Sequence, residues 1–501
     1  MAVPIIDRII GWFDPQRAYM RGAWREQLDL QRGTYDAAGY DRLNGGWRIY
    51  NEAAEFTDRT GRDVIRARAR DLERNSDMAG GLISAFKRNV IGSGYTLQAN
   101  TGDKELDEKI EREWKNWCKK QHCDITGQQS LNQLLRMAIV RKKVDGGILF
   151  LKTYNGSGLI PLQLQTLEVD ELSSSQTAPK HKGNKVIGGI ELNAYNRPVG
   201  YWIEKYSLDG FALNEPQYVD ASRVIFLWQK KRPSQIREVS DFAPTIPRIR
   251  DANELMTAVS VKERIAACLA VFIRKITPGG GGSNFGRPAQ VSSDGTIQYK
   301  GKMLSPGMIQ EMNPGEDVQV VDPKGSGGEA AGMLKIQQQL MASGQGVSYE
   351  AVSRDMSGVN YSSARQSTVE DGLTFAEDIE LIKELLDEIY ESFLISGYLA
   401  GVFDFPEFFI NREKKRQYLT HQWVSSPKPW IDPIKEANAN RIALENGIKT
   451  YQQIAAEQGR DWKEMLDEMI EVRDYCQEHK LHLGGDIYDY AGDETAAGAG
   501  E

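Results

Sequence analysis

The sequence feature that most limits the possible fold is a periodic apolar run at residues 364–397. Apolar side chains recur there every three or four positions over about nine turns, which is the spacing of one buried face of a helix. Its apolar members are Val369, Leu373, Ile379, Ile382, Leu386, Ile389 and Phe393. The run therefore predicts one very long helix.

The polar positions of this predicted helix are strongly acidic. Lys383 is the single lysine among them, against the carboxylates Glu370, Asp371, Glu377, Asp378, Glu380, Glu384, Asp387, Glu388 and Glu391. The simplest interpretation is a solvated face on a helix that packs into a core.

A second long helix is predicted at residues 247–275. Pro247 suits a helix start, and apolar residues follow at helical spacing over a length of about 40 Å. The helix should end before the glycine-rich stretch PGGGGSNFGRP. Two short strand-like pieces, TIQYKG and DVQVVD, come next, and a helix resumes at Met333. This pattern predicts a small excursion bounded by two helices.

The first half of the chain has mixed signals. Helices are expected at 60–75, from 76 to about 91, at 105–120 and at 130–143, with strands near 96, 147–154, 161–168, 186–193, 198–206 and 223–229. The helix at 60–75 carries five arginines, and a solvated face is its simplest interpretation. The fold class predicted is α+β and predominantly helical.

Three shorter helices are predicted near the end of the sequence, at 433–446, 450–458 and 461–480. From Gly484 the chain reads GGDIYDYAGDETAAGAGE. This acidic, low-complexity composition cannot build a core, so we predict a disordered tail at 484–501.

Composition excludes several classes of protein. The 501 residues contain four cysteines, too few and too scattered for a disulfide framework, so we expect a reducing compartment. No signal peptide and no membrane-spanning run is recognisable. The net charge of −8 argues against tight nonspecific DNA binding, which needs an excess of Lys and Arg.

Catalytic and metal-binding motifs are not found. No phosphate-binding loop, G-x-S-x-G elbow or H-E-x-x-H pair is present. Two groups contain residues of the kinds that bind metals: Cys118 with His122 and Cys123, and Cys476 with His479 and His482. The first lacks a paired C-x-x-C, and the second does not share one helix face. We therefore predict a non-enzyme without catalytic residues, metal or cofactor.

One polar stretch separates two predicted helices: Ser353 to Arg365, SRDMSGVNYSSAR. It is small, polar and partly basic, and it carries no catalytic signature. A simple interhelical connection is the plainest interpretation.

Several segments together resemble the lambda family of phage portal proteins. They include Arg66 to Gly94, FLWQKKRPSQIREVSDFAP, EMNPGED, GVSYEAVSRDMSGVNYSSAR and WIDPIKEANANRIALENGIKTYQQIAAEQGRDWKEML. The combination is specific and spans almost the whole chain. Two positions depart from the family pattern, which has glycine where this chain has Glu238, and is proline-rich where PKGSGGEA stands.

The resemblance implies a ring of about a dozen copies around a channel for double-stranded DNA. The implied regions are a wing at 1–246 and 364–429, stem helices at 247–275 and 332–346, a clip at 276–331, a tunnel loop at 347–363 and a crown at 430–483. The long acidic helix would run beside the channel.

The resemblance also implies where DNA would be met. The tunnel-loop residues are Arg354, Ser357, Gly358, Asn360, Tyr361, Ser362 and Arg365, with Gly358 expected to supply flexibility. The channel-facing stem candidates are Lys262, Arg264, Arg274 and Lys275. The loop residues would make short-lived contacts with phosphates and would not bind them tightly.

The implied partners are further copies of the chain, viral DNA without sequence preference, the terminase large subunit, major capsid and scaffold proteins, and head-tail adaptor or neck proteins, but no membrane. The implied place is the capsid vertex of a virion assembled in the host cytoplasm. Two alternatives remain at this point: a DNA-packaging nuclease or ATPase, and a connector or scaffold module that does not contact DNA.

Overall fold

The computed structural model describes residues 51–156, 158–206, 215–267, 271–275, 316–320, 327–426 and 433–479, with residue 481 and scattered residues between 12 and 49. The chain divides into two compact units, 1–57 and 58–501. The second unit holds all the described sheets and the long helices. Helix α3, Ala54–Arg59, spans the boundary between the units.

The N-terminal part of the second unit is largely helical, as predicted. Its elements are α4 (Arg62–Asn75), α5 (Asp77–Phe86), the π-helical turn η2 (Lys87–Ile91), β1 (Thr96–Ala99), α6 (Lys104–Trp117), α7 (Lys120–Cys123) and α8 (Leu131–Val144). Gly92 makes the turn before β1 with φ +53°, where a Cβ would collide with the side chain of Ser426. Asp103 and the Ser130–Gln133 capping box begin α6 and α8.

Two antiparallel sheets follow. β2 (Gly147–Thr153) is central in the first, between β3 (Gln163–Leu167) and β8 (Val224–Trp228). The second runs in the order β4 (Lys185–Ile187), β5 (Ile190–Leu192), β6 (Pro198–Ile203) and β7 (Gln217–Asp220). The strand predicted at 186–193 is thus a hairpin, because Gly188 and Gly189 turn the chain with positive φ.

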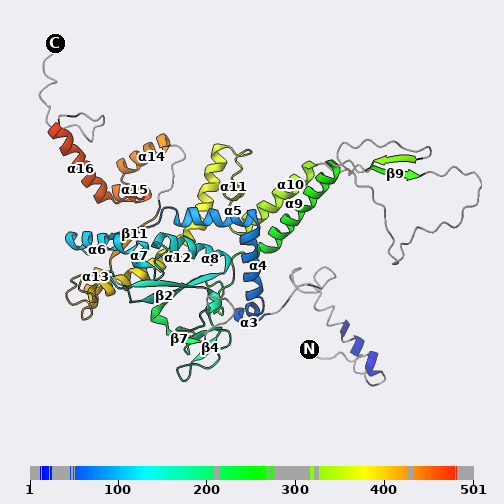
Figure 1. The fold of residues 1–501 in the computed structure, drawn as a ribbon, viewed down its shortest axis with the longest axis horizontal. Coiled ribbons are helices and arrows are strands. Elements are labelled where there is room, and N and C mark those ends of the chain that lie inside the picture. Colours follow the sequence, from blue (N-terminus) through cyan, green and yellow to red (C-terminus); the bar gives the residue numbers. More distant parts are fainter. Residues whose placement is uncertain are drawn as a thin grey trace, which may run out of the picture. The chain divides into compact units, whose positions relative to one another are not determined.

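The predicted helix at 247–275 was wrong in its second part. α9 ends at Ala267, and Val271–Lys275 forms strand β9, which pairs antiparallel with β10 (Glu316–Val320). The consecutive residues Val271, Phe272 and Ile273 favour an extended backbone once a partner strand is available. Helix α10 (Gly327–Gly344) then lies beside α9 (Ile246–Ala267) (Figure 1). Most of the predicted clip, 276–331, lies outside the described residues.

The predicted long helix is confirmed, and it is longer than expected. α12 runs from Tyr361 to Leu399, 39 residues or roughly 58 Å, and starts three residues earlier than predicted. Ile382, Leu386, Ile389 and Phe393 are buried, whereas Val369 and Leu373 are exposed. Only the second half of the apolar run is therefore covered by this chain.

Aromatic side chains surround the buried half of α12. Phe393 packs edge-on against Trp114 of α6 with ring centroids 5.0 Å apart, and Tyr390 contacts Trp114 and Trp423 in the same way. Phe375 makes a T-shaped contact with Phe86 of α5. Such pairs add about 0.5–1.5 kcal/mol each beyond the buried area.

A buried charge cluster also holds α12. Lys142 Nζ lies 2.7 Å from Asp378 Oδ1 and 2.9 Å from Asp241 Oδ2, and Lys143 Nζ lies 2.8 Å from Asp378 Oδ2. Burial opposes the charge of Asp241, but Lys142, Lys143 and Lys231 outweigh it and lower its pKa to about 2. The cluster joins α8, the segment before α9, and α12.

The arginine-rich helix α4 is not simply a solvated face. Arg66 is buried and forms ion pairs with Asp63, Asp170 and Glu238. Glu238, where the family pattern has glycine, is wholly buried and also accepts two bonds from Arg237, at 2.7 and 2.9 Å. Its charge is therefore compensated by two guanidinium groups.

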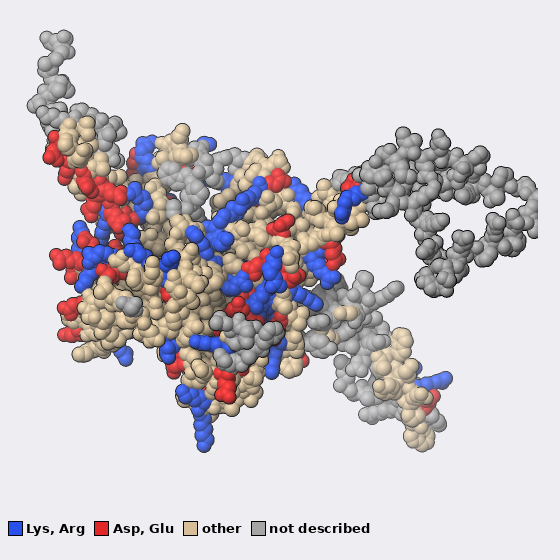
Figure 2. Space-filling view, in the orientation of Figure 1, with Lys and Arg blue, Asp and Glu red and all other residues tan. Residues whose placement is uncertain are grey.

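The C-terminal helices were predicted correctly. β11 (His421–Val424) pairs with β1 and follows α13 (Arg412–Tyr418). The last helices are α14 (Pro433–Glu445), α15 (Tyr451–Glu457) and α16 (Trp462–His479). Asp and Glu side chains lie along the surface of α16 (Figure 2). The tail from 484 lies outside the described residues.

Replacing Asp378 tests the buried cluster. We expect Asp378→Ala to lower the free energy of unfolding by about 3–5 kcal/mol, because two buried ammonium groups lose a carboxylate. Glu384→Ala changes an exposed carboxylate of the same helix and should stay within about 0.5 kcal/mol. Urea denaturation followed by tryptophan fluorescence measures both, and equal effects would contradict the assignment.

Glu111 of α6 makes stability depend on pH. Burial raises its pKa from 4.5 to about 7, opposed by the bond from Ala99 N–H and assisted by the charges of Asp461, Asp107 and Glu464. Between about pH 4.5 and pH 7 the folded state keeps Glu111 protonated, whereas the unfolded state releases the proton. The free energy of unfolding therefore falls as pH rises through this window. We expect Glu111→Gln to gain thermal stability relative to wild type across this window. A difference that does not change with pH would contradict this.

Candidate nucleic-acid interface

The predicted tunnel loop is shorter than expected. Residues 347–363 include helix α11 (Tyr349–Ser353) and the first turn of α12, so only residues 354–360 connect the two helices. Arg354 ends α11 in the left-handed conformation, φ 58°, and its backbone N–H donates to Glu350 O at 2.9 Å. Its side chain is exposed.

Asp355 organises the connection. Its Oδ1 accepts bonds from Ser357 N at 3.0 Å and from Ser357 Oγ at 2.5 Å. These two bonds lower the pKa of Asp355. Gly358 needs no special backbone, because its φ is not positive and an added Cβ would meet open space. The conformation of Gly358 seen here is therefore one that other residues could also adopt.

Asn360 is the N-cap of α12. Its Oδ1 accepts from Ser363 N at 2.9 Å, and Ser363 Oγ accepts from Asn360 N at 3.1 Å. Tyr361, Ser362 and Arg365 are consequently helical, and Ser362 and Arg365 are exposed in the first turns of α12. The sequence rule for capping residues could have found this boundary.

The fold brings Arg88, a cation from a distant part of the sequence, near Arg354. Burial and the nearby charge of Arg354 both lower the pKa of Arg88, which belongs to η2. The charge of Lys335 on α10 also lowers the pKa of the Asp355 carboxyl. Lys and Arg side chains lie over the region of α5 and α11 (Figure 2). No local motif relates residues 88, 335 and 354.

The stem candidates divide into two groups. Lys262 and Arg264 lie on α9, where Arg264 is exposed and its Nε donates to Ser260 O at 3.3 Å. Arg274 and Lys275 lie on β9 instead, opposite Asp317 and Glu316 of β10. The expectation that all four share one stem helix was therefore wrong.

The acidic residues of α12 also divide by role. Asp371 accepts bonds from the backbone and hydroxyl of Ser348, both 2.6 Å, and Asp387 accepts from Trp423 Nε1 at 2.6 Å. Asp378 belongs to the buried cluster. The carboxylates left exposed include Glu370, Glu377, Glu380 and Glu384. The solvated acidic face is real, but it is narrower than the sequence suggested.

In the first cysteine group, the thiol of Cys123 contacts backbone carbonyl groups. Cys123 Sγ lies 3.5 Å from Cys118 O and 3.6 Å from Gln129 O, and burial raises the pKa of the Cys123 thiol to about 12. Among the described residues no cluster of His, Cys, Asp or Glu suits a metal ion. His482 of the second group lies outside them.

The described helices also include none with the length and apolar character needed to cross a membrane.

The model of the family "Phage portal protein, lambda family" matches residues 40–377. The chain belongs to this family. It is 24% identical over 466 residues to a probable portal protein of Halomonas phage phiHAP-1, covering 89% of this chain and 87% of the relative. It is 19% identical over 439 residues to portal protein B of Escherichia phage lambda, covering 81% and 82%.

Two solved structures of gene transfer agent particles are also similar. One is the neck of a native particle computed with C12 symmetry, at 13% identity and TM-score 0.46, covering 80% of this chain and 99% of that one. The other is the neck of an empty particle computed with C6 symmetry, at 13% identity and TM-score 0.46, covering 83% and 96%.

The capping role of Asn360 can be tested directly. We expect Asn360→Ala to destabilise the start of α12 by about 1 kcal/mol, because the Ser363 N–H loses its acceptor. Amide hydrogen exchange of residues 361–366 should speed up accordingly, while exchange near Phe393 stays unchanged. The control is Ser362→Ala, which changes a residue two positions after Asn360 that takes no part in the cap. Equal exchange in both variants would contradict the role.

Proposed function

We propose that this chain forms a closed ring of about twelve copies at one capsid vertex, through which double-stranded DNA is packaged and later ejected. The observation that carries the proposal is the family match over residues 40–377, which includes α11, the loop and the first part of α12. The relatives matched over most of their length are named portal proteins.

The arrangement of elements supports a division of labour in that ring. We assign residues 1–246 and 364–429 to the wing, 430–483 to the crown, and the paired helices α9 and α10 to the stem. The clip is assigned to 276–331, with β9 and β10 at its base. A pair of adjacent helices is stiff, and identical copies arranged around one axis can place such pairs around a central channel.

The loop residues fit transient contact with DNA. Arg354 and Arg365 are exposed at the two sides of the connection, and Ser357 and Asn360 are occupied in holding it. Each phosphate neutralised deepens binding, so a channel that must let DNA slide should offer few cations. The exposed carboxylates of α12 limit the attraction further.

The remaining roles concern partners. We propose that a separate terminase supplies the motor and docks on the clip, and that capsid, scaffold and adaptor proteins bind the outer faces. The ring would be assembled in the host cytoplasm and retained in the virion. The absence of a phosphate-binding loop from the sequence agrees with a separate motor.

Substitution of the two arginines tests the proposal better than deletion of the loop, since deletion would remove the Asn360 cap. We expect Arg354→Gln/Arg365→Gln to form normal annular particles by negative-stain imaging, yet to retain about tenfold less DNA in filled heads. A tenfold change corresponds to a loss of roughly 1.4 kcal/mol in the free energy of the phosphate contacts.

Lys182→Gln/Lys185→Gln is the matched control, because it removes the same charge from exposed positions at and just before strand β4. A purified wild-type chain that never gives annular particles would overturn the ring. Unchanged DNA retention in the arginine variant would overturn the role of the loop alone. ATP turnover or DNA cleavage by the purified chain would favour an enzyme instead.

A further inference from the structure

A surface cavity of about 450 Å³ lies beside α13, far along the chain from the loop. Its lining residues are Arg412, Lys415, Arg416, Leu419, Thr420 and His421. No carboxylate is among them, although the chain as a whole carries a net charge of −8. The cavity lining therefore carries two arginines and a lysine and no acidic group, on a chain that is acidic as a whole.

Two side chains of the cavity lining already contact carboxylates of α12. Lys415 Nζ lies 2.7 Å from Glu391 Oε1, and His421 Nε2 lies 2.9 Å from Asp387 Oδ1. These pairs fix α13 and the start of β11 against the long helix. They also position the cavity without satisfying its other charges.

The two arginines of α13 are left uncompensated. Neither Arg412 nor Arg416 forms an ion pair with a described residue, and both are exposed. They are four positions apart, so they lie on the same face of the helix. By contrast, Lys414 on the same helix pairs with Glu407 at 3.1 Å.

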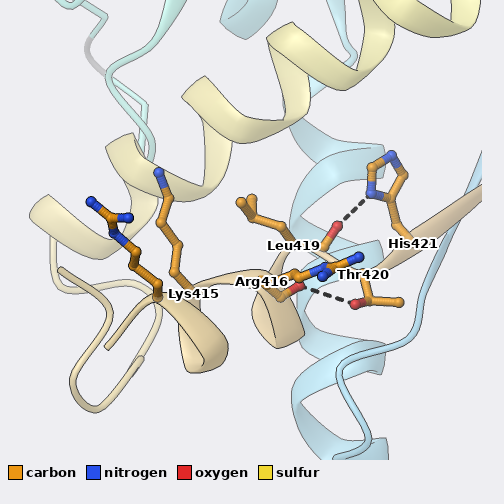
Figure 3. A pocket seen from close by; sticks show the side chains of 6 residues that line it. Lys415, Arg416, Leu419, Thr420 and His421 are labelled. Atoms are coloured by element: carbon orange, nitrogen blue, oxygen red, sulfur yellow. Dashed lines mark hydrogen bonds between the residues drawn. The ribbon is translucent and has the colours of Figure 1, made fainter. Parts of the chain in front are cut away.

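The shape of the site favours an extended ligand. Lys415 and Arg416 lie on different sides of Leu419 and point in different directions (Figure 3). Thr420 Oγ1 donates to Arg416 O at 3.0 Å, and His421 Nδ1 contacts Leu419 O at 2.7 Å, so these groups are occupied. The cations line an open groove and do not converge on one point. A chain of separated negative charges fits this arrangement better than a single small anion.

We propose that this groove binds the phosphate backbone of nucleic acid through Arg412 and Arg416, outside the loop between α11 and α12. Guanidinium groups match phosphate oxygens in fork geometry and are weakly hydrated, which makes arginine suited to nucleic-acid backbones. The choice of nucleic acid rests on the proposed portal function. The groove itself rests on the cavity and its unpaired arginines.

The test is direct binding by the purified full-length chain. A short fluorescent DNA duplex is titrated at several salt concentrations against wild type, Arg412→Gln/Arg416→Gln and Lys414→Gln/Lys463→Gln. We expect the arginine variant to bind about tenfold more weakly, with the salt slope reduced by about 2, since each phosphate contact contributes about 0.9. The lysine variant loses the same charge outside the groove and should resemble wild type.

Three results would overturn the proposal. The first is equal DNA binding by the two variants, and the second is a loss of polyglutamate binding in the arginine variant that is as large as its loss of DNA binding. The third is saturation of the groove by inorganic phosphate alone. The second would assign the groove to an acidic protein segment, and the third to a free anion. Because Arg354 and Arg365 are intact in every variant, and no head filling is measured, failure here leaves the channel proposal untouched.

Discussion

The contact between α8 and α12 inside the core is the interaction on which the rest of the structure depends. Lys142 and Lys143 of α8 meet Asp378 of α12 and Asp241 before α9. Charges buried this way are tolerated only when every partner is in place, because each isolated ion would carry a large desolvation cost. The cluster therefore fixes the register of α12, and with it both ends of that helix.

The position of α12 explains the two surfaces described above. At its N-terminus the helix begins at the Asn360 cap, so its placement sets where Arg354 and Arg365 are presented. Near its C-terminus Asp387 and Glu391 hold His421 and Lys415, and so place the α13 groove. One rigid helix can thus carry two separate cationic sites while its exposed carboxylates keep the face between them acidic.

Much of the fold could be predicted because its signals are local. The period of α12, the capped helices α6 and α8, and the three C-terminal helices all follow from residues close in sequence. The strand Val271–Lys275 could not be separated from helix α9, since its apolar run suits both, and only pairing with residues 316–320 decides. The paired state of Arg66 with Glu238 depends likewise on residues 172 positions apart.

The sequence by itself determined the long acidic helix and the polar connection before it, since each is a matter of residue types at short spacing. It also indicated the family, through several such segments that occur in order along the chain. Only the tertiary structure decided which carboxylates of α12 are buried partners and which face solvent, and which arginines remain unpaired. The physical reason is that a charge acquires its role from groups within a few ångströms, and chain folding brings those groups from distant positions.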